Sequence, residues 1–386
     1  MKRIYLDHAA TTPMDADCAK LMFSYMKESF GNPSSLHFFG RKARGCVQIA
    51  REQVASLLHA DRDEIVFTSG GSESDNFALK GAALANRKKG RHIITTQMEH
   101  HAVLHTCKWL EGEGFLVTYL PVNKNGLVLE EDVRRAIRPD TILISMMFAN
   151  NELGTIQPVA AVGEMARSQG ILFHTDAVQA AGHVPIDVKK MQIDLLSLSG
   201  HKFYGPPGMG ALFVRRGTGL ENLLHGGGQE FGLRAGTENV PGICGLGFAA
   251  EKAVRMMAKE EILLQELWGL LRKGIAEIMP SARFNGGAGQ RLPGHLHVSF
   301  PGIDGQALLL ALDMKGIAVS AGSACTAGKT EISHVLSAIG LPEEYAAGSV
   351  RFSLGRGNSK EEVEAVLALL PKLLARLLPE KKLDTI

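Results

Sequence analysis

Short apolar runs alternate with longer amphipathic segments through the first two-thirds of this 386-residue chain. The stretch Val47–His59 is typical of the longer segments, because its aliphatic side chains recur at helical spacing. Strands that alternate with helices predict a mostly parallel sheet covered on both faces, which is an α/β fold. Seven strands are expected, at Glu64–Thr68, His92–Thr96, Phe115–Leu120, Thr141–Met147, Ile171–Thr175, Asp194–Leu198 and Ala211–Val214.

The pattern changes at Pro241, where helical periodicity begins and continues to Met279. We expect one long helix that leaves a large domain, residues 15–255, near Met256. The smaller α+β domain then comprises residues 1–14 and 256–386. Its expected elements are strands at His295–Phe300, Ile317–Val319 and Ser349–Leu354, a helix at Gly305–Met314, and a last helix that Ser359 caps and Pro371 kinks or restarts.

The composition of the chain gives no sign of a nucleic-acid or membrane partner. Hydrophobic residues make up 45% of the chain, charged residues 21%, and the formal charge is +2, so neither nucleic acid nor an anionic membrane is expected. No apolar stretch is long enough to span a bilayer, and the N-terminus lacks a signal-peptide pattern. The five cysteines are scattered without metal-type spacing, which favours a reducing cytoplasm.

Lys202 stands in the most informative segment of the chain. It follows an apolar run of strand type and lies among Gly, Pro, Ser and His residues. Apolar surroundings lower the pKa of a lysine, which can then form a Schiff base with a carbonyl. Ser199, Gly200 and His201 can hydrogen-bond a phosphate, so the segment fits a pyridoxal phosphate (PLP) site. An exposed loop lysine is the ordinary alternative.

Two further segments at predicted strand ends fit the same cofactor. Residues 69–74 read Ser-Gly-Gly-Ser-Glu-Ser before a helix, where free N–H groups and the helix dipole favour a phosphate. Asp176 ends a buried strand, where a protonated pyridine nitrogen would be a suitable partner, and Gln179 could bond the ring hydroxyl. The structural alternatives are helix caps formed by Ser72 and Asp176.

Glu99-His100-His101 also follows a predicted strand. One imidazole could stack on a flat ring and serve as an acid or base near neutral pH. A surface histidine pair is the alternative. Adjacent histidines also suggest a metal, but no third ligand lies nearby in the sequence at suitable spacing, so we expect no metal site.

Two candidates lie in the second domain. Cys325 occupies a small-residue stretch, about 320–332, and a mobile exposed loop suits a nucleophile that must travel, although lone loop cysteines are often inert. Arg351 lies in an apolar strand and needs an acidic partner, either a substrate carboxylate or an internal Asp or Glu. Asn151, in the first domain, follows a buried strand at the same sheet edge as Asp176.

Taken together, these segments resemble the NifS/IscS-type cysteine desulfurases of the class V aminotransferase family. The motifs that carry the likeness lie at 5–13, 31–35, 68–74, 99–100, 150–154, 174–179, 199–202, 234–237, 322–326 and 350–352. Each motif is a modest signal alone, but the ordered set is specific. Two departures are His101, where a lysine is common, and Pro207, where the Gly-rich turn often has a lysine.

The resemblance implies a fold-type-I PLP enzyme with a seven-stranded sheet, normally a homodimer. Lys202 would form the Schiff base, Asp176 would pair with the pyridine nitrogen, Gln179 would bond the ring hydroxyl, and His100 would stack on the ring. The phosphate would be held by Gly71, Ser72, Ser199 and His201, with Thr237 reaching in from the partner subunit.

The resemblance also implies the reaction, the conversion of L-cysteine to L-alanine. Asn151 would contact cofactor and substrate, and Arg351 would bind the substrate carboxylate. Cys325 would take the sulfur as a persulfide for a sulfur-acceptor protein, in iron–sulfur cluster assembly or tRNA thiolation. The alternatives are a small-amino-acid aminotransferase, a selenocysteine lyase, or a non-catalytic sulfur carrier or scaffold of the same fold.

Overall fold

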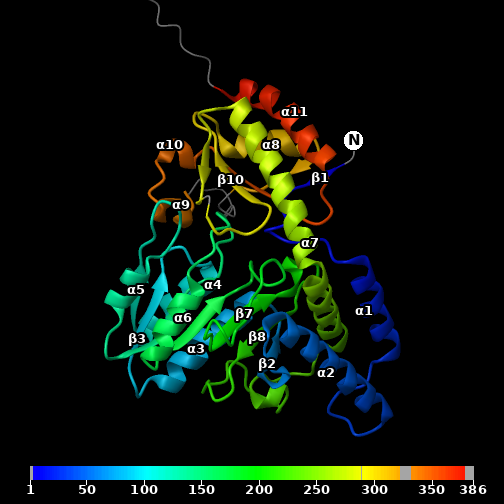
Figure 1. Cartoon of the computed structure of the whole chain (residues 1–386). Helices are drawn as coiled ribbons and strands as arrows, with labels where there is room; N and C mark the ends of the chain where they lie inside the picture. Colours follow the sequence, from blue (N-terminus) through cyan, green and yellow to red (C-terminus); the bar gives the residue numbers. More distant parts are fainter. Residues whose placement is uncertain (1–2, 288, 322–331, 379–386) are drawn as a thin grey trace, which may run out of the picture.

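In the computed structural model, the large part of the molecule is built on a seven-stranded sheet that lies among helices (Figure 1). The structure describes residues 3–287, 289–321 and 332–378. The strand order is β2-β8-β7-β6-β5-β3-β4, and β8 alone runs antiparallel to its neighbours. The strands are β2 (Ile65–Thr68), β3 (His92–Thr96), β4 (Leu116–Leu120), β5 (Thr141–Ser145), β6 (Leu172–Asp176), β7 (Leu195–Ser199) and β8 (Gly210–Val214). All seven predicted strands are confirmed within a few residues at their ends.

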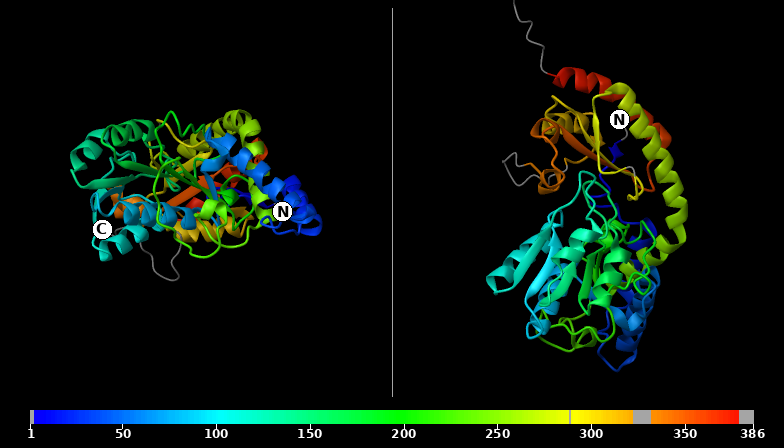
Figure 2. Two further views of the ribbon diagram at one scale, coloured as in Figure 1. Left: turned by 90° about the horizontal axis from the view of Figure 1, so that it is seen from below. Right: turned by 60° about the vertical axis from the view of Figure 1, so that its left-hand side comes forward.

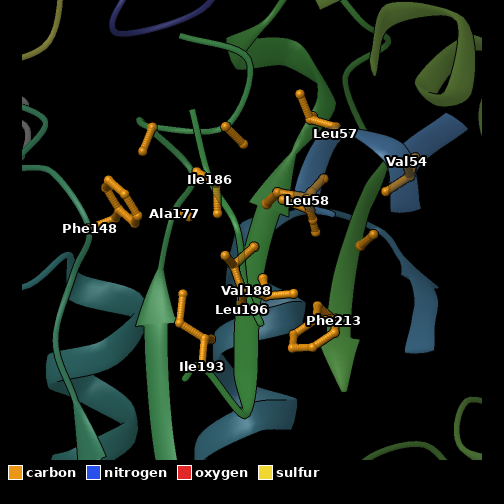
Figure 3. Packing of buried hydrophobic residues seen from close by; sticks show 14 of the residues in the cluster. Val54, Leu57, Leu58, Phe148, Ala177, Ile186, Val188, Ile193, Leu196 and Phe213 are labelled. Atoms are coloured by element: carbon orange, nitrogen blue, oxygen red, sulfur yellow. The ribbon is translucent and has the colours of Figure 1, made fainter. Parts of the chain in front are cut away.

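Helices cover both faces of this sheet, as the alternating pattern predicts. One face packs on α3 and α4, and the other on α2, α5, α6 and the first half of α7. Figure 3 shows part of this second interface, in which Leu58 and Val54 of α2 approach Leu196 of β7 and Phe213 of β8. The helices in this part are α1 (Ala16–Glu28), α2 (Phe38–Leu58), α3 (Gly71–Asn86), α4 (His101–Gly112), α5 (Glu130–Ala136) and α6 (Val159–Ser168).

A single helix, α7 (Val240–Ile278), extends for 39 residues along the edge of the molecule (Figure 2). Its buried residues up to Ala253 pack in the core beside the large sheet, and those from Leu264 pack in a separate hydrophobic core. The long helix is therefore confirmed. The predicted boundary near Met256 lies between the two sets of buried residues, and the division into two domains stays a prediction.

The second core belongs to the smaller part of the chain. Its elements are β1 (Ile4–Tyr5), β9 (Arg283–Asn285), β10 (His295–Ser299), α8 (Gly305–Asp313), β11 (Ile317–Ala318), α9 (His334–Ala338), α10 (Glu343–Ala346), β12 (Ser349–Ser353) and α11 (Lys360–Leu377). Strand β10 lies between β12 and β9, and β1 pairs with β11, so the N-terminus joins this part. Ser359 caps α11 as expected. Of the two predicted effects of Pro371, the restart is wrong because the helix is continuous through it, and the kink stays a prediction. The helix continues because its buried leucines on both sides of Pro371 pack in one core, which outweighs one missing hydrogen bond.

Among the helices that the structure describes, none combines the length and the apolar character needed to cross a bilayer.

Candidate functional site

The proposed site lies where parallel strands β5, β6 and β7 end at the same edge of the large sheet. Asp176 is the last residue of β6, and Ser199 is the last residue of β7. A short 3-10 turn, Gly200–Lys202, places Lys202 directly beyond that edge. His100 follows β3 in the same way and precedes α4. The rule that ligands bind beyond the carboxyl ends of parallel strands therefore brings the predicted residues together.

The turn between β2 and α3 is shaped for close approach of a ligand. Gly70 has φ 149°, a conformation that L side chains rarely adopt, and no side chain caps the helix that starts at Gly71. A Cβ at Gly210 would lie 2.6 Å from the Gly70 Cα, so the close approach of β8 to this turn requires glycine at Gly210. The turn lines a hollow together with residues of the Lys202 segment, namely Ser69, Gly70, Gly71, Ser72, Glu73, Ser199, His201, Pro207 and Gly208. Such a helix start is suited to an anion.

Lys202 extends away from β7 toward the N-terminal segment. Its Nζ donates hydrogen bonds of 2.8 Å to the carbonyl oxygens of Ala9 and Ala10. Burial, and to a smaller extent the positive charge of Arg351, lower the pKa of Lys202 to about 8, although the charges of Asp176 and Asp7 oppose this shift. The lysine is therefore far more often neutral at pH 7 to 8 than an exposed one, as a Schiff-base lysine requires.

Asp176 is buried and accepts a 2.9 Å hydrogen bond from the backbone N–H of Val178. Burial raises the pKa of Asp176, while the nearby His100 and Lys202 lower it. Asp75, from α3, is also buried, and its pKa is raised by burial and by the charge of Asp176. Among the described residues, the one group of three potential metal ligands is Asp75, His100 and Asp176, with ligand atoms within 4.8 Å of one another. The site thus brings two carboxyl groups and one imidazole together.

His100 forms the N-cap of α4, and its Nδ1 accepts a 3.1 Å hydrogen bond from the Ala102 N–H. That bond occupies the Nδ1 lone pair, so the neutral ring carries its proton on Nε2. The side chain is exposed at the rim of the site.

Comparisons with known proteins agree with this geometry. The family model described as Aminotransferase class-V matches residues 4–366. A curated cysteine desulfurase IscS from Methanosarcina thermophila is 54% identical over 376 residues, which are 97% of this chain and 93% of the relative. A second curated cysteine desulfurase IscS, from Dictyoglomus turgidum, is 49% identical over 378 residues, which are 98% of this chain and 96% of the relative. This chain belongs to the cysteine desulfurases of the class V aminotransferase family.

Solved structures give the same assignment. A NifS-like protein superposes with a TM-score of 0.92 at 40% identity, covering 97% of this chain and all of the other. SspA, solved in complex with cysteine, superposes with a TM-score of 0.82 at 42% identity, covering 92% of this chain and 99% of its own. The fold-type-I architecture expected from the sequence is therefore confirmed for this desulfurase-family chain.

Arg351, on β12, has an internal partner. It donates hydrogen bonds of 2.8 Å to the Asp7 carboxylate and to the Asn151 carbonyl oxygen. Its Nε has no partner among the residues that the structure describes. The structural alternative considered for Arg351, an internal acid, is thus present, while the predicted substrate contact is not tested. Asn151 lies beside Arg351, as a shared substrate site requires.

The N-terminal segment 5–12 of this family member lies across the site, which the strand and helix pattern does not predict. The Ala9 carbonyl accepts a hydrogen bond from Gln179 as well as from Lys202. Thr11 Oγ1 lies 3.0 Å from His201 Nδ1. The only sequence signal for this role is the family motif at 5–13, whose residues are too short and polar to show where they pack.

Two other predicted residues stand apart. Thr237 lines a second hollow that shares Ser69 and Gly208 with the first one, and the structure of one chain does not test its contribution to a partner subunit. Cys325 lies outside the described residues.

A buried ion pair anchors the loop before Thr237, and the sequence analysis did not find it. Arg51 of α2 binds both carboxylate oxygens of Glu230 at 2.8 Å. The guanidinium lies between the rings of Phe67 and Phe231, 4.7 and 4.8 Å from their centroids. Arg234, further along this loop, binds Glu73 at the start of α3 at 2.9 Å. The loop is thereby attached to the phosphate-type turn.

Proposed function

We propose that this chain converts L-cysteine to L-alanine and transfers the sulfur to Cys325 as a persulfide. The observation that carries the proposal is the meeting of Lys202, Asp176 and His100 beyond one edge of the sheet, beside a glycine turn suited to an anion. The names of the curated relatives support the same reaction.

The residues present fit PLP. The hollow at the start of α3 has the glycine geometry and donors for its phosphate, from Gly71, Ser72, Ser199 and His201. The buried Asp176 carboxylate would pair with the pyridine nitrogen, and Gln179 would bond the ring hydroxyl. Gln179 Nε2 and Lys202 Nζ both donate hydrogen bonds to the Ala9 carbonyl oxygen, so the two side chains lie close together. When bound, PLP supplies an electron sink that weakens bonds at Cα and Cβ of an amino acid.

Lys202 would hold the cofactor through its amine and would then take the Cα proton of the substrate. Its lowered pKa keeps a useful fraction of the amine neutral, and the carbonyls of Ala9 and Ala10 orient Nζ. The Nδ1 atom of His100 accepts a hydrogen bond from the Ala102 N–H, so the neutral ring carries its proton on Nε2. The Nε2–H group can donate a hydrogen bond to the sulfur of the substrate when that sulfur is a thiolate. Arg351 and Asn151 orient the substrate, with Arg351 binding the carboxylate.

Cys325 supplies the acceptor thiol. Its thiolate forms an S–S bond to the substrate sulfur as the Cβ–S bond of the substrate breaks. The electron pair of the broken Cβ–S bond stays on Cβ, which then takes up a proton. The balanced result is cysteine plus one thiol giving alanine plus one persulfide. Burial raises the pKa of the Cys107 and Cys244 thiols, so these are unsuited to the step.

We further infer a homodimer and a sulfur-acceptor protein as partners. An exposed aromatic cluster at the α1–α2 connection supports an interface, because Phe30, Phe38 and Phe39 are all solvent-accessible and Phe30 stacks on Phe39. Thr237 would contribute to the phosphate site of the second subunit. The acceptor belongs to iron–sulfur cluster assembly or to tRNA thiolation.

Mass spectrometry after incubation with cysteine tests the reaction. We expect alanine in the supernatant and a single added sulfur on the peptide that contains Cys325. Cys325→Ala should keep the visible absorbance of the bound cofactor and lose the sulfur release, whereas Cys46→Ala, which removes a half-buried thiol, should change neither. Persulfide formation that persists in Cys325→Ala would refute the mechanism, and transamination of alanine would favour an aminotransferase.

A further inference from the structure

The chain that carries Cys325 is attached to the rest of the protein on both sides of that residue. On the first side, Ser320 exchanges two backbone hydrogen bonds with Arg351: its N–H donates at 3.2 Å, and its carbonyl oxygen accepts at 2.7 Å. On the second side, Ser333 forms the N-cap of α9. Because Arg351 is the proposed receptor for the substrate carboxylate, the first attachment lies beside the proposed substrate site.

The attachment at Ser333 is a buried polar contact. Its Oγ donates to the Glu152 carboxylate, 2.8 Å from Oε1 and 2.7 Å from Oε2, and accepts a 3.1 Å hydrogen bond from the Val335 N–H. Ser333 is 5% exposed and Glu152 is 4% exposed. Within the part of the chain that the structure describes, this hydroxyl is the one hydrogen-bond donor to the carboxylate. A buried carboxylate needs such a donor, so the two residues depend on each other.

The next residue, His334, makes a second polar contact with the large part of the molecule. Its Nε2 donates a 2.9 Å hydrogen bond to the Glu99 carbonyl oxygen. In the sequence, Glu99 precedes His100 and Glu152 follows Asn151. The start of α9 is thus bonded to the direct chain neighbours of two residues that would handle the substrate.

Apolar packing holds α9 to the same two segments. One cluster, separate from the second core, joins side chains at α9 to side chains beside Glu99 and Glu152. Its buried members are Met98, Met147, Leu153, Val335, Leu336, Ile339 and Leu341. Figure 1 shows α9 where the two parts of the molecule approach each other. This helix is therefore packed on the large part, although it lies in the sequence range of the smaller one.

Attachment on both sides confines Cys325 more than attachment on one side would. Cys325 is five residues after Ser320 and eight residues before Ser333. Even a fully extended chain would take it at most about 18 Å from the first residue and about 29 Å from the second. Release of the second attachment would remove one of these limits and enlarge the volume that the thiol samples. A smaller volume gives the thiol a higher effective concentration at the substrate sulfur.

We propose that Glu152 and Ser333 are positioning residues for sulfur transfer. The hydrogen bond between them holds the chain beyond Cys325 beside Asn151, and so keeps the acceptor thiol within reach of the substrate. This role rests on the proposed desulfurase function, because it requires Cys325 to be the sulfur acceptor.

Ser333→Ala, on the full chain loaded with PLP, tests the proposal at pH 8. Burial raises the pKa of Glu152 to about 7, so its carboxylate is mostly ionised at this pH. Rapid quenching and mass spectrometry give the rate of persulfide formation at Cys325, and the change in cofactor absorbance gives the affinity for cysteine. We expect the rate to fall by about tenfold or more, because a hydrogen bond to a charged group shifts an equilibrium by about 10–100-fold. The affinity for cysteine should not change.

Three further variants separate this contact from a general loss of structure. Ser333→Thr keeps a hydroxyl at the N-cap and should restore most of the rate. Ser359→Ala is the matched control, because Ser359 caps α11 through the same kind of hydrogen bond, and it should leave the rate unchanged. Glu152→Gln keeps the capping serine and removes only the charge, so it provides the test if Ser333→Ala does not fold. It should slow persulfide formation by about fivefold, since a neutral acceptor makes a weaker hydrogen bond.

The outcomes distinguish this proposal from the proposed function. A parent protein that forms the persulfide, with Ser333→Ala and Glu152→Gln forming it equally fast, overturns the positioning role alone. That role is also overturned if both variants weaken the affinity for cysteine as much as they slow the transfer, because the contact then supports the site as a whole. Absence of a persulfide on Cys325 in the parent protein refutes the proposed function and the positioning role with it.

Discussion

Arg351 donates a 2.8 Å hydrogen bond to the carboxylate of Asp7, and this pair links β12 to the segment that crosses the site. The arginine is buried, and its guanidinium lowers the pKa of Lys202, while Asp7 raises it. The same guanidinium is therefore a structural partner of Asp7 and the candidate receptor for a substrate carboxylate.

Two variants separate these roles. Arg351→Gln should raise the KM for cysteine by about 10–100-fold, because a hydrogen bond to a charged group is worth about 1.5–3 kcal/mol. Asp7→Asn should change the KM for cysteine by no more than a few-fold. It removes the carboxylate charge that competes with the substrate for Arg351, and it keeps Arg351 itself. Steady-state kinetics at saturating cofactor measure both, with Arg138→Gln, an exposed arginine, as the control. If the two variants raised KM equally, Arg351 would act only through Asp7.

The lowered pKa of Lys202 predicts a pH dependence for cofactor loading. The neutral amine is the form that reacts, and its fraction rises with pH until the pKa near 8 is passed. The rate at which apoprotein takes up PLP should therefore rise about tenfold per pH unit below 8 and level off above it. Stopped-flow absorbance measures this rate. A rate that keeps rising to pH 10 would mean that Lys202 has the pKa of an exposed lysine.

Much of this site follows from local sequence pattern. The seven strands were predictable because each is a short run rich in apolar residues between turn residues, and the position of Asp176 at the sheet edge follows from the parallel topology. The glycine turn before α3 was predictable because its backbone needs glycine at Gly70.

Contacts between distant segments were not predictable. The approach of Ala9 to Lys202, of Arg51 to Glu230 and of His334 to His101 depends on how complete elements pack. Helical or strand periodicity describes the face of one element and carries no information about the partner of that face.

Glu99 predicts how stability changes with pH. It is fully buried, and burial raises its pKa to about 8, so the folded chain keeps a proton that the unfolded chain releases above its ordinary pKa of 4.5. Its contribution to stability therefore falls as pH rises from about 4.5 to 8, by at most about 1.4 kcal/mol per pH unit. Glu99→Gln stays neutral and should lessen this loss.

Urea unfolding at pH 5, 6, 7 and 8 measures the effect of Glu99. The difference in unfolding free energy between Glu99→Gln and the parent should grow in favour of the variant as pH rises. Glu113→Gln changes an exposed glutamate and should give a difference that does not vary with pH. A constant difference for Glu99→Gln as well would show that Glu99 is ionised in the folded protein.

The Arg51–Glu230 pair predicts a contrast between buried and exposed ion pairs. Both side chains are 4% exposed, and Glu230 also accepts a 2.8 Å hydrogen bond from the Phe67 N–H. Glu230 and Phe231 have positive φ values of 46° and 60°, so the pair also holds a loop in a conformation that non-glycine residues avoid. Arg51→Met leaves a buried charge without its partner and should cost about 3–5 kcal/mol of unfolding free energy.

The matched control is Arg62→Met, whose pair with Glu52 has both side chains 54% exposed and should cost no more than about 1 kcal/mol. Urea unfolding measures both variants. The double variant Arg51→Met/Glu230→Met should recover part of the unfolding free energy that Arg51→Met loses, because it no longer leaves the Glu230 carboxylate buried without a partner. If Arg51→Met cost no more than Arg62→Met, the anchor of the Thr237 loop would lie in the Glu73–Arg234 pair instead.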